Sequence, residues 1–133
     1  LATLTGACMV GLGPNIAGLF SPSDDLAAEV MAAANATGER IHRLPLDPDM
    51  ATLMKSRRAD LKNISGSPYG GAITGALFLQ NFVGETPWAH LDIAGPTLFE
   101  GDKPKGHIVP GATGFGVLTL VEMVRAAMER GAA

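Results

Sequence analysis

Short apolar segments of strand length alternate with helix signals along this chain, and this alternation constrains the fold most strongly. Residues 17–20 are apolar, and residues 21–25 (SPSDD) then favour a helix start, because Ser, Pro and Asp suit a first helical turn. Gly38 is a plausible stop for that helix. Residues 88–93 alternate in polarity as a strand does, after a helical pattern over 71–84. The alternation predicts an α/β fold, with part of a mixed sheet flanked by helices.

The first part of the chain predicts further strands. Residues 2–12 mix Thr, Val, Leu and Met and indicate buried strands that stop at a turn over 13–15. Residues 40–46 indicate an edge strand or an extended segment, a second short helix is expected from Asp47, and residues 59–64 indicate a weak strand.

The last part of the chain predicts a long loop followed by a helix. Residues 95–114 have no period, and a loop of that length is typically functional or packed on a partner. Apolar side chains then recur at helical spacing and predict an amphipathic helix that ends near Gly131. These side chains are Val117, Leu120, Val121, Val124 and Met128.

Composition excludes several classes of protein. The chain has 133 residues, which fits a single domain, and its net charge of -3 gives no basic footprint for nucleic acid or anionic lipid. Its longest apolar run falls well short of the ~18 residues of a membrane helix. Cys8 is its one cysteine, which suits a reducing compartment. Because 47% of the residues are hydrophobic and the chain opens at Leu1 in a strand-like segment, we expect a fragment whose missing part covers some of its surface.

Two glycine-rich segments carry weak binding signals. Residues 11–18 (GLGPNIAG) superficially suggest a dinucleotide fingerprint, but Ile16 stands where the third glycine is needed, which favours a hairpin turn. Residues 111–116 (GATGFG) precede a helix, so their amides could hold an anion. Plain helix entry with close packing is the favoured interpretation of that segment.

Titratable residues form no complete catalytic group. His90 and Asp92 share one face of the expected strand, but a metal centre needs three or four donors, and His42 and His107 lie in other segments. A satisfied hydrogen-bond pair in a core or interface is therefore favoured over a metal site. The basic cluster, Lys55, Arg57, Arg58 and Lys62, is interpreted as a solvated face or an intersubunit salt bridge rather than a phosphate site.

Seven short motifs, in their order along the chain, carry a more specific signal. Together they resemble the C-terminal part of the catalytic domain of the leucyl aminopeptidase (cytosol aminopeptidase) family, M17, from Leu1 to about Arg125. The motifs are residues 2–8 (ATLTGAC), 17–21 (AGLFS), 43–46 (RLPL), 70–74 (GGAIT), 78–79 (FL), 88–95 (WAHLDIAG) and 111–117 (GATGFGV).

The resemblance implies a metal-dependent aminopeptidase that hydrolyses N-terminal residues from peptides. Members use two divalent metal ions, manganese or zinc, and usually form cytoplasmic hexamers. Their metal ligands and catalytic Lys and Arg precede the Thr-Leu-Thr-Gly strand, in motifs that these 133 residues lack. Residues 1–133 are therefore expected to be the C-terminal portion of the catalytic domain, without the N-terminal domain or the metal-ligand segment. We expect no catalytic residue and no bound metal in this portion.

The resemblance assigns a substrate wall to this portion. Thr3 and Gly6 would border the pocket for the first side chain, and the backbone of Leu4 would face the scissile group. Ala94 matches another pocket position, and Thr97 stands where members often carry Met. The resemblance also implies that residues 1–133 supply contacts between subunits of the oligomer.

The residues leave an alternative function open. The chain could be a non-catalytic assembly or binding module that retains the fold without the metal centre. In either case no nucleic acid and no membrane is expected as a partner.

Overall fold

The sheet has three strands and runs in the order β2–β1–β3. In the computed structural model, which describes residues 1–106 and 108–131, β1 (Ala17–Phe20) lies between β2 (Ile41–Arg43) and β3 (His90–Asp92). β2 is parallel to β1, and β3 is antiparallel to it, with Leu19 opposite Leu91. The predicted mixed sheet and the edge position of β2 are therefore confirmed.

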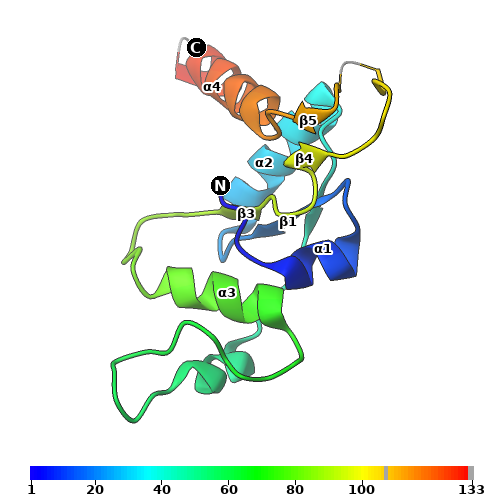
Figure 1. The fold of residues 1–133 in the computed structure, drawn as a ribbon. Helices are drawn as coiled ribbons and strands as arrows, with labels where there is room; N and C mark the ends of the chain where they lie inside the picture. The colour runs from blue at the N-terminus through cyan, green and yellow to red at the C-terminus, as the bar shows by residue number, and fades with distance from the viewer. Residues whose placement is uncertain (107, 132–133) are drawn as a thin grey trace.

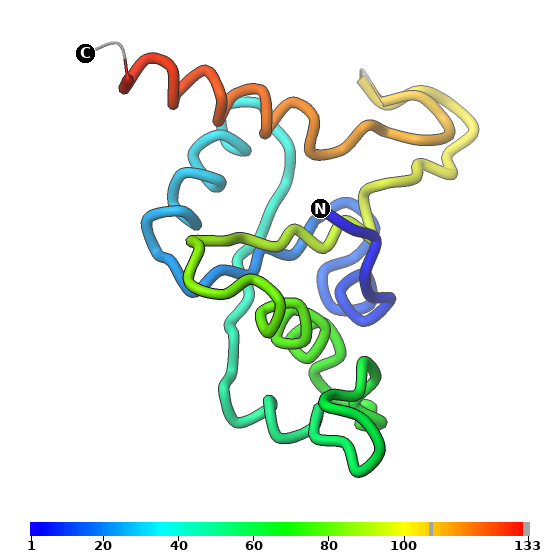
Figure 2. The backbone as a smooth tube through the Cα atoms, turned by 90° about the vertical axis from the view of Figure 1, so that its left-hand side faces the viewer, coloured from blue at the N-terminus to red at the C-terminus, as the bar shows by residue number. Residues whose placement is uncertain are grey.

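Helices cover both faces of this sheet (Figure 1). α2 (Asp24–Thr37) and α4 (Val117–Gly131) pack together on one face, over a core that includes Leu19 and Val30. α1 (Gly6–Leu12) and α3 (Gly71–Gln80) lie on the other face, around Phe20. Figure 2 shows the two helix layers at opposite ends of the molecule with the strands between them. The α/β fold class is confirmed.

The predicted strand over 2–12 is wrong for most of its length. Only Ala2 makes a β-bridge, to Asp92, whereas residues 6–12 form α1. The physical reason is a helix cap: the Thr5 hydroxyl accepts a 3.0 Å hydrogen bond from the amide of Cys8. Gly13, with φ of 81°, ends this helix, so residues 13–15 connect a helix to β1 rather than forming a hairpin.

Helix α2 begins two residues later than the Ser21 signal indicates. Ser23 is its N-cap and accepts from the amide of Leu26, whereas Ser21 Oγ accepts from Ser23 N and donates to the carbonyl of Trp88. The predicted stop at Gly38 is confirmed, because this residue adopts the left-handed conformation.

Three other segments agree only in part with the prediction from their residue patterns. The short helix expected from Asp47 is the 3₁₀ helix η1 (Pro48–Met54), whereas residues 59–64 contain no strand. The expected loop 95–114 contains an antiparallel pair, β4 (Leu98–Phe99) and β5 (Gly111–Ala112). His107, expected in that loop, lies outside the described residues.

The final helix follows its prediction over Val117–Gly131, but its apolar stripe is exposed. Thr119 is fully buried and Met123 packs on the core beside α2. The stripe itself is 44–69% exposed, and comprises Val117, Leu120, Val121, Val124 and Met128. Across the described residues, no helix is both long and apolar enough to cross a membrane.

Candidate functional site

The carboxylate of Asp92, fully buried at the end of β3, organises the start of the chain. Its Oδ1 accepts hydrogen bonds from the amides of Leu4 (3.1 Å) and Ala94 (3.2 Å). Its Oδ2 accepts from the amide of Thr5 (3.1 Å) and from the Thr5 hydroxyl (2.6 Å). Four donors therefore surround one buried negative charge, and such charge-assisted bonds are among the strongest that a neutral amide makes.

Backbone pairing places the start of the chain alongside β3. The amide of Ala2 donates to the carbonyl of Leu91 (3.1 Å), and the amide of Ile93 donates to the carbonyl of Ala2 (2.9 Å). Thr5 continues this arrangement, because its hydroxyl both donates to Asp92 and caps α1 at Cys8. The segment between Ala2 and α1 is thus held at one end by its pairing with β3 and at the other end by Thr5.

The structure brings together some, but not all, of the predicted substrate residues. Leu4 and Ala94 are joined through the same carboxylate oxygen, and Thr3 and Gly6 flank the anchored pair of Leu4 and Thr5. Thr3, Leu4 and Gly6 are exposed, and Ala94 is half-buried. These residues can therefore form one wall with accessible backbone.

Thr97 lies farther along the same loop and is held separately. Its amide donates to the carbonyl of Ile93 (3.2 Å), and its carbonyl accepts from the amide of Thr113 (3.0 Å). Its hydroxyl donates to the Ile93 carbonyl as well. In the described part of the chain, no hydrogen bond joins Thr97 to the Thr3–Gly6 segment.

Small residues let α3 approach the start of the chain closely. A Cβ atom at Gly75 would lie 3.0 Å from Thr5 Cγ2 and 3.2 Å from Leu4 Cδ2. A Cβ atom at Gly71 would lie 2.9 Å from Cβ of Ala7. A larger residue at Gly71 would therefore force α1 and α3 apart, whereas at Gly75 the side chains of Thr5 and Leu4 would have to move slightly.

The prediction that His90 and Asp92 form a satisfied hydrogen-bond pair is wrong. The Asp92 oxygens are used by the residues described above, whereas His90 stacks on Phe20 with ring centroids 6.0 Å apart. His90 is 4% exposed, and its Nε2 has no partner among the described residues. Burial lowers the pKa of His90, against an opposing effect of the Asp92 charge.

Burial also suppresses the reactivity of the single cysteine. Cys8 is 2% exposed, and burial, followed by the charge of Asp92, raises the pKa of its thiol. A thiol held in its protonated form is a poor nucleophile and a poor metal ligand. Cys8 is therefore a packing residue, set against β1 at Gly18.

The helix start after 111–116 holds an anion from the chain itself. The Glu39 carboxylate accepts from the amide of Gly116 (2.7 Å), the amide of Thr119 (2.8 Å) and the Thr119 hydroxyl (2.6 Å). The free amides that an external anion would need are thus occupied, which excludes the anion site considered for this segment.

The described residues do not fit a metal centre. Among them, no three His, Cys, Asp or Glu side chains lie together as a possible ligand set. The nearest approach to one, His90 with Asp92, fails because the carboxylate oxygens already accept four hydrogen bonds. The basic cluster, Lys55, Arg57, Arg58 and Lys62, is exposed, as the solvated interpretation expects.

The sequence does not indicate the hydrogen-bond partners of two buried or half-buried acids, Asp92 and Glu39. The link between Asp92 and Thr5 had a partial signal, since Thr three residues before Cys8 can cap a helix, but the strand-like composition of 2–12 masked it. Glu39 had no signal, because its partners at 116–119 lie some 77 to 80 residues away.

Comparison with known proteins identifies the family of this chain. The sequence model described as "Cytosol aminopeptidase family, catalytic domain" matches residues 1–121. The chain therefore belongs to the cytosol aminopeptidase family, and the resemblance drawn from its motifs is confirmed.

Individual relatives agree with this assignment. A probable cytosol aminopeptidase of Synechococcus sp. (strain JA-3-3Ab) is 56% identical over 126 residues, which are 95% of this chain and 24% of the relative. The chloroplastic neutral leucine aminopeptidase of Solanum lycopersicum is 57% identical over 93% of this chain and 21% of its own length.

Solved structures agree at the level of the backbone. A bottromycin maturation enzyme, BotP, in complex with Mn superimposes with a TM-score of 0.90 and 44% identity, covering 95% of this chain and 28% of that chain. The chain thus spans about a quarter of the length of the proteins that it matches.

Proposed function

We propose that these residues are the C-terminal part of the catalytic domain of a metal-dependent aminopeptidase, and that they form one wall of its peptide site. The family assignment supports the reaction class. The Asp92 carboxylate supports the placement of the wall, because it fixes the Leu4 and Ala94 amides on one oxygen atom. This shared anchor is the single observation on which the proposed wall rests.

In this proposal, the chain binds and orients substrate but does not hold the metal ions. Thr3 and Gly6 border the pocket for the first side chain, Leu4 presents its backbone to the scissile group, and Ala94 and Thr97 continue the wall. Two divalent ions, manganese or zinc, would be held by polypeptide outside residues 1–133, since the described residues offer no ligand set for them. When bound, such ions supply an activated water and polarise the peptide carbonyl.

The proposed setting follows the family. Relatives named cytosol aminopeptidases support a cytoplasmic enzyme, although one relative is chloroplastic. Peptide substrates and a hexameric assembly of identical chains complete the proposal, with these residues contributing some of the oligomer contacts.

The pocket assignment is tested with the whole gene product that carries these residues. Ala94→Leu should lower kcat/KM for leucine p-nitroanilide at least tenfold and reduce it less for alanine p-nitroanilide, because added bulk excludes larger side chains first. Ala59→Leu, at an exposed position, serves as the matched control. Equal losses for the two substrates would contradict the assignment.

The division of roles is tested with residues 1–133 alone. This chain should not hydrolyse leucine p-nitroanilide in the presence of manganese or zinc. Turnover at the rate of the whole gene product would refute the proposal, and an inactive whole gene product would favour the alternative of a non-catalytic module.

A further inference from the structure

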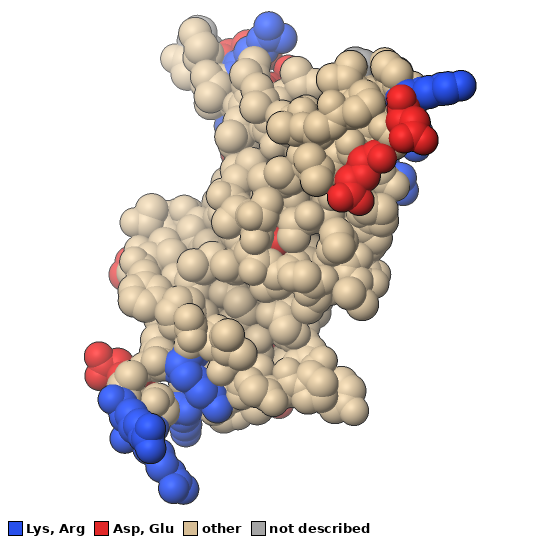
Figure 3. Space-filling model, in the orientation of Figure 1, with Lys and Arg blue, Asp and Glu red and all other residues tan. Residues whose placement is uncertain are grey.

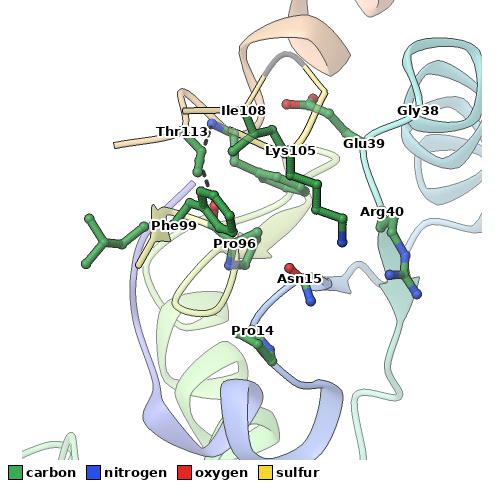
Figure 4. A pocket seen from close by; sticks show the side chains of 12 residues that line it. Pro14, Asn15, Gly38, Glu39, Arg40, Pro96, Phe99, Lys105, Ile108 and Thr113 are labelled. Carbon is green, nitrogen blue, oxygen red and sulfur yellow. Dashed lines mark hydrogen bonds between the residues drawn. The ribbon is translucent and has the colours of Figure 1, made fainter. Parts of the chain in front are cut away.

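A cavity of about 200 Å³ lies between the end of α1, the start of β2 and the β4–β5 hairpin, beside the loop that carries Thr97 (Figure 4). Its body is apolar, with Phe99, Ile108 and Phe115 among the walls. At about 200 Å³ it is smaller than the roughly 300–1,000 Å³ pockets that take drug-sized ligands. It therefore suits a molecule of one ring or a few carbon atoms.

Two cationic side chains, Arg40 and Lys105, line this cavity. Figure 4 shows Lys105 extending from its loop toward Asn15, with Arg40 on the β2 side of the same space. Neither cation forms an ion pair with any residue that the structure describes. The backbone of Lys105 is held by two hydrogen bonds with Ile108: its amide donates to the Ile108 carbonyl (2.8 Å), and its carbonyl accepts from the Ile108 amide (3.1 Å).

The acid in the same wall does not neutralise these cations. Glu39 lines the cavity, but both of its carboxylate oxygens accept hydrogen bonds from the start of α4. Its charge is therefore balanced by the positive end of a helix. The cavity retains a net positive charge beside apolar walls and one neutral amide, Asn15.

We propose that this cavity binds a small organic anion, a carboxylate on a short apolar or aromatic body. The carboxylate would lie beside Lys105, Arg40 and the Asn15 amide, because these cavity-lining side chains supply two positive charges and hydrogen-bond donors. The body would lie against Phe99 and Phe115, where its burial is favourable. Pro96 and Leu98 also line the cavity and flank Thr97, so the ligand would contact the loop that continues the substrate wall.

The test is a titration of the ¹⁵N-labelled whole gene product that carries these residues with benzoate, followed by amide chemical shifts. Benzoate should bind saturably and shift the amides of Asn15, Arg40 and Lys105, and the affinity should fall as salt is raised. Benzamide, the neutral analogue, should bind at least tenfold more weakly. Inorganic phosphate, which lacks the apolar body, should also bind at least tenfold more weakly.

Variants separate this site from general attraction to positive charge. Arg40→Gln combined with Lys105→Gln should weaken benzoate binding at least tenfold, whereas Lys103→Gln, an exposed lysine outside the cavity, should leave it unchanged. Absence of saturable shifts, shifts confined to other surfaces, equal binding of benzamide or phosphate, or an equal effect of Lys103→Gln would overturn the proposal.

Discussion

At the scale of single residues, Asp92 connects local structure to the proposed function. Its side chain is an acceptor for Leu4, Thr5 and Ala94, and it has no exposed surface. A buried donor left without an acceptor costs more free energy than one hydrogen bond contributes. The stability of all these contacts therefore depends on the Asp92 carboxylate.

Replacing Asp92 with Asn should therefore be costly. The amide group of Asn places a donor where Oδ2 accepts from Thr5, so Asp92→Asn should lower the free energy of unfolding by about 2–4 kcal/mol. Urea unfolding of the 133-residue chain measures the change. Asp102→Asn, at an exposed loop position, is the control, and equal midpoints for the two variants would contradict the prediction.

His90 should make stability depend on pH. Burial lowers its pKa in the folded chain below the value of 6.5, so the unfolded chain takes up the proton first as pH falls. The contribution of His90 is thus complete above pH 6.5, and the free energy of unfolding declines as pH drops below it toward the depressed pKa. Urea midpoints measured between pH 7.5 and about 5 test this expectation, because that pH range lies above the pKa values of ordinary carboxyl groups.

His90→Phe isolates this effect. Phenylalanine retains the stacking on Phe20 and removes the titrating group and its unpartnered nitrogen. The variant should lose less stability than the parent chain between pH 7.5 and 5. Parallel pH profiles for the two proteins would show that His90 does not titrate on unfolding.

At the scale of elements, the sequence predicted those whose start signals are local. α2 is marked by its Ser and Asp residues and by Gly38, and α4 by its apolar period. α1 was mistaken for strand, because its seven residues GACMVGL are too short to show a helical period and its cap is a single Thr. β4 and β5 were missed, because two-residue strands carry no pattern.

The candidate site was predictable only in part for the same reason. The resemblance assigned Thr3, Leu4, Gly6, Ala94 and Thr97 to one wall. The anchor that joins Leu4 to Ala94 is Asp92, which lies 88 residues from Leu4 and has no local signal for that role. The cavity residues Asn15, Arg40 and Lys105 come from three separate segments, so no spacing along the chain indicates them.

The contact between Glu39 and α4 gives a prediction at this scale. Glu39→Gln removes the negative charge from the helix start and should lower the free energy of unfolding by about 1 kcal/mol. Amide hydrogen exchange should become faster at Gly116 and Thr119, the two donors to this carboxylate. Glu85→Gln, at an exposed site, should leave both amides protected, and unchanged exchange in Glu39→Gln would contradict this role.

At the scale of the whole molecule, the exposed apolar stripe of α4 is an unusual surface. In Figure 3 the middle of the visible face has few charged side chains, and α4 crosses one end of the molecule (Figure 1). Contiguous exposed apolar residues favour association in water. The isolated chain should therefore self-associate at high concentration.

Charge placed on the stripe should reduce that association. Val121→Glu with Val124→Glu should shift sedimentation toward the monomer and leave the melting temperature nearly unchanged, since both side chains are exposed. Thr52→Glu with Ala59→Glu is the control, because it also changes the net charge from -3 to -5 (two added carboxylates) at exposed sites outside α4. Equal reduction in both variants would show that net charge, not the stripe, governs association.

The hydrogen bonds from Leu4 and Thr5 to Asp92 also limit when these residues can fold during translation. The amides of Leu4 and Thr5 are translated 87 to 88 residues before their acceptor, Asp92. Since a contact of such long range forms only after the intervening chain has been made and closed, Leu4 and Thr5 cannot reach their final place until Asp92 has left the ribosome. A nascent chain that stalls between these two points therefore carries a helix start at Thr5 whose buried acceptor is still missing.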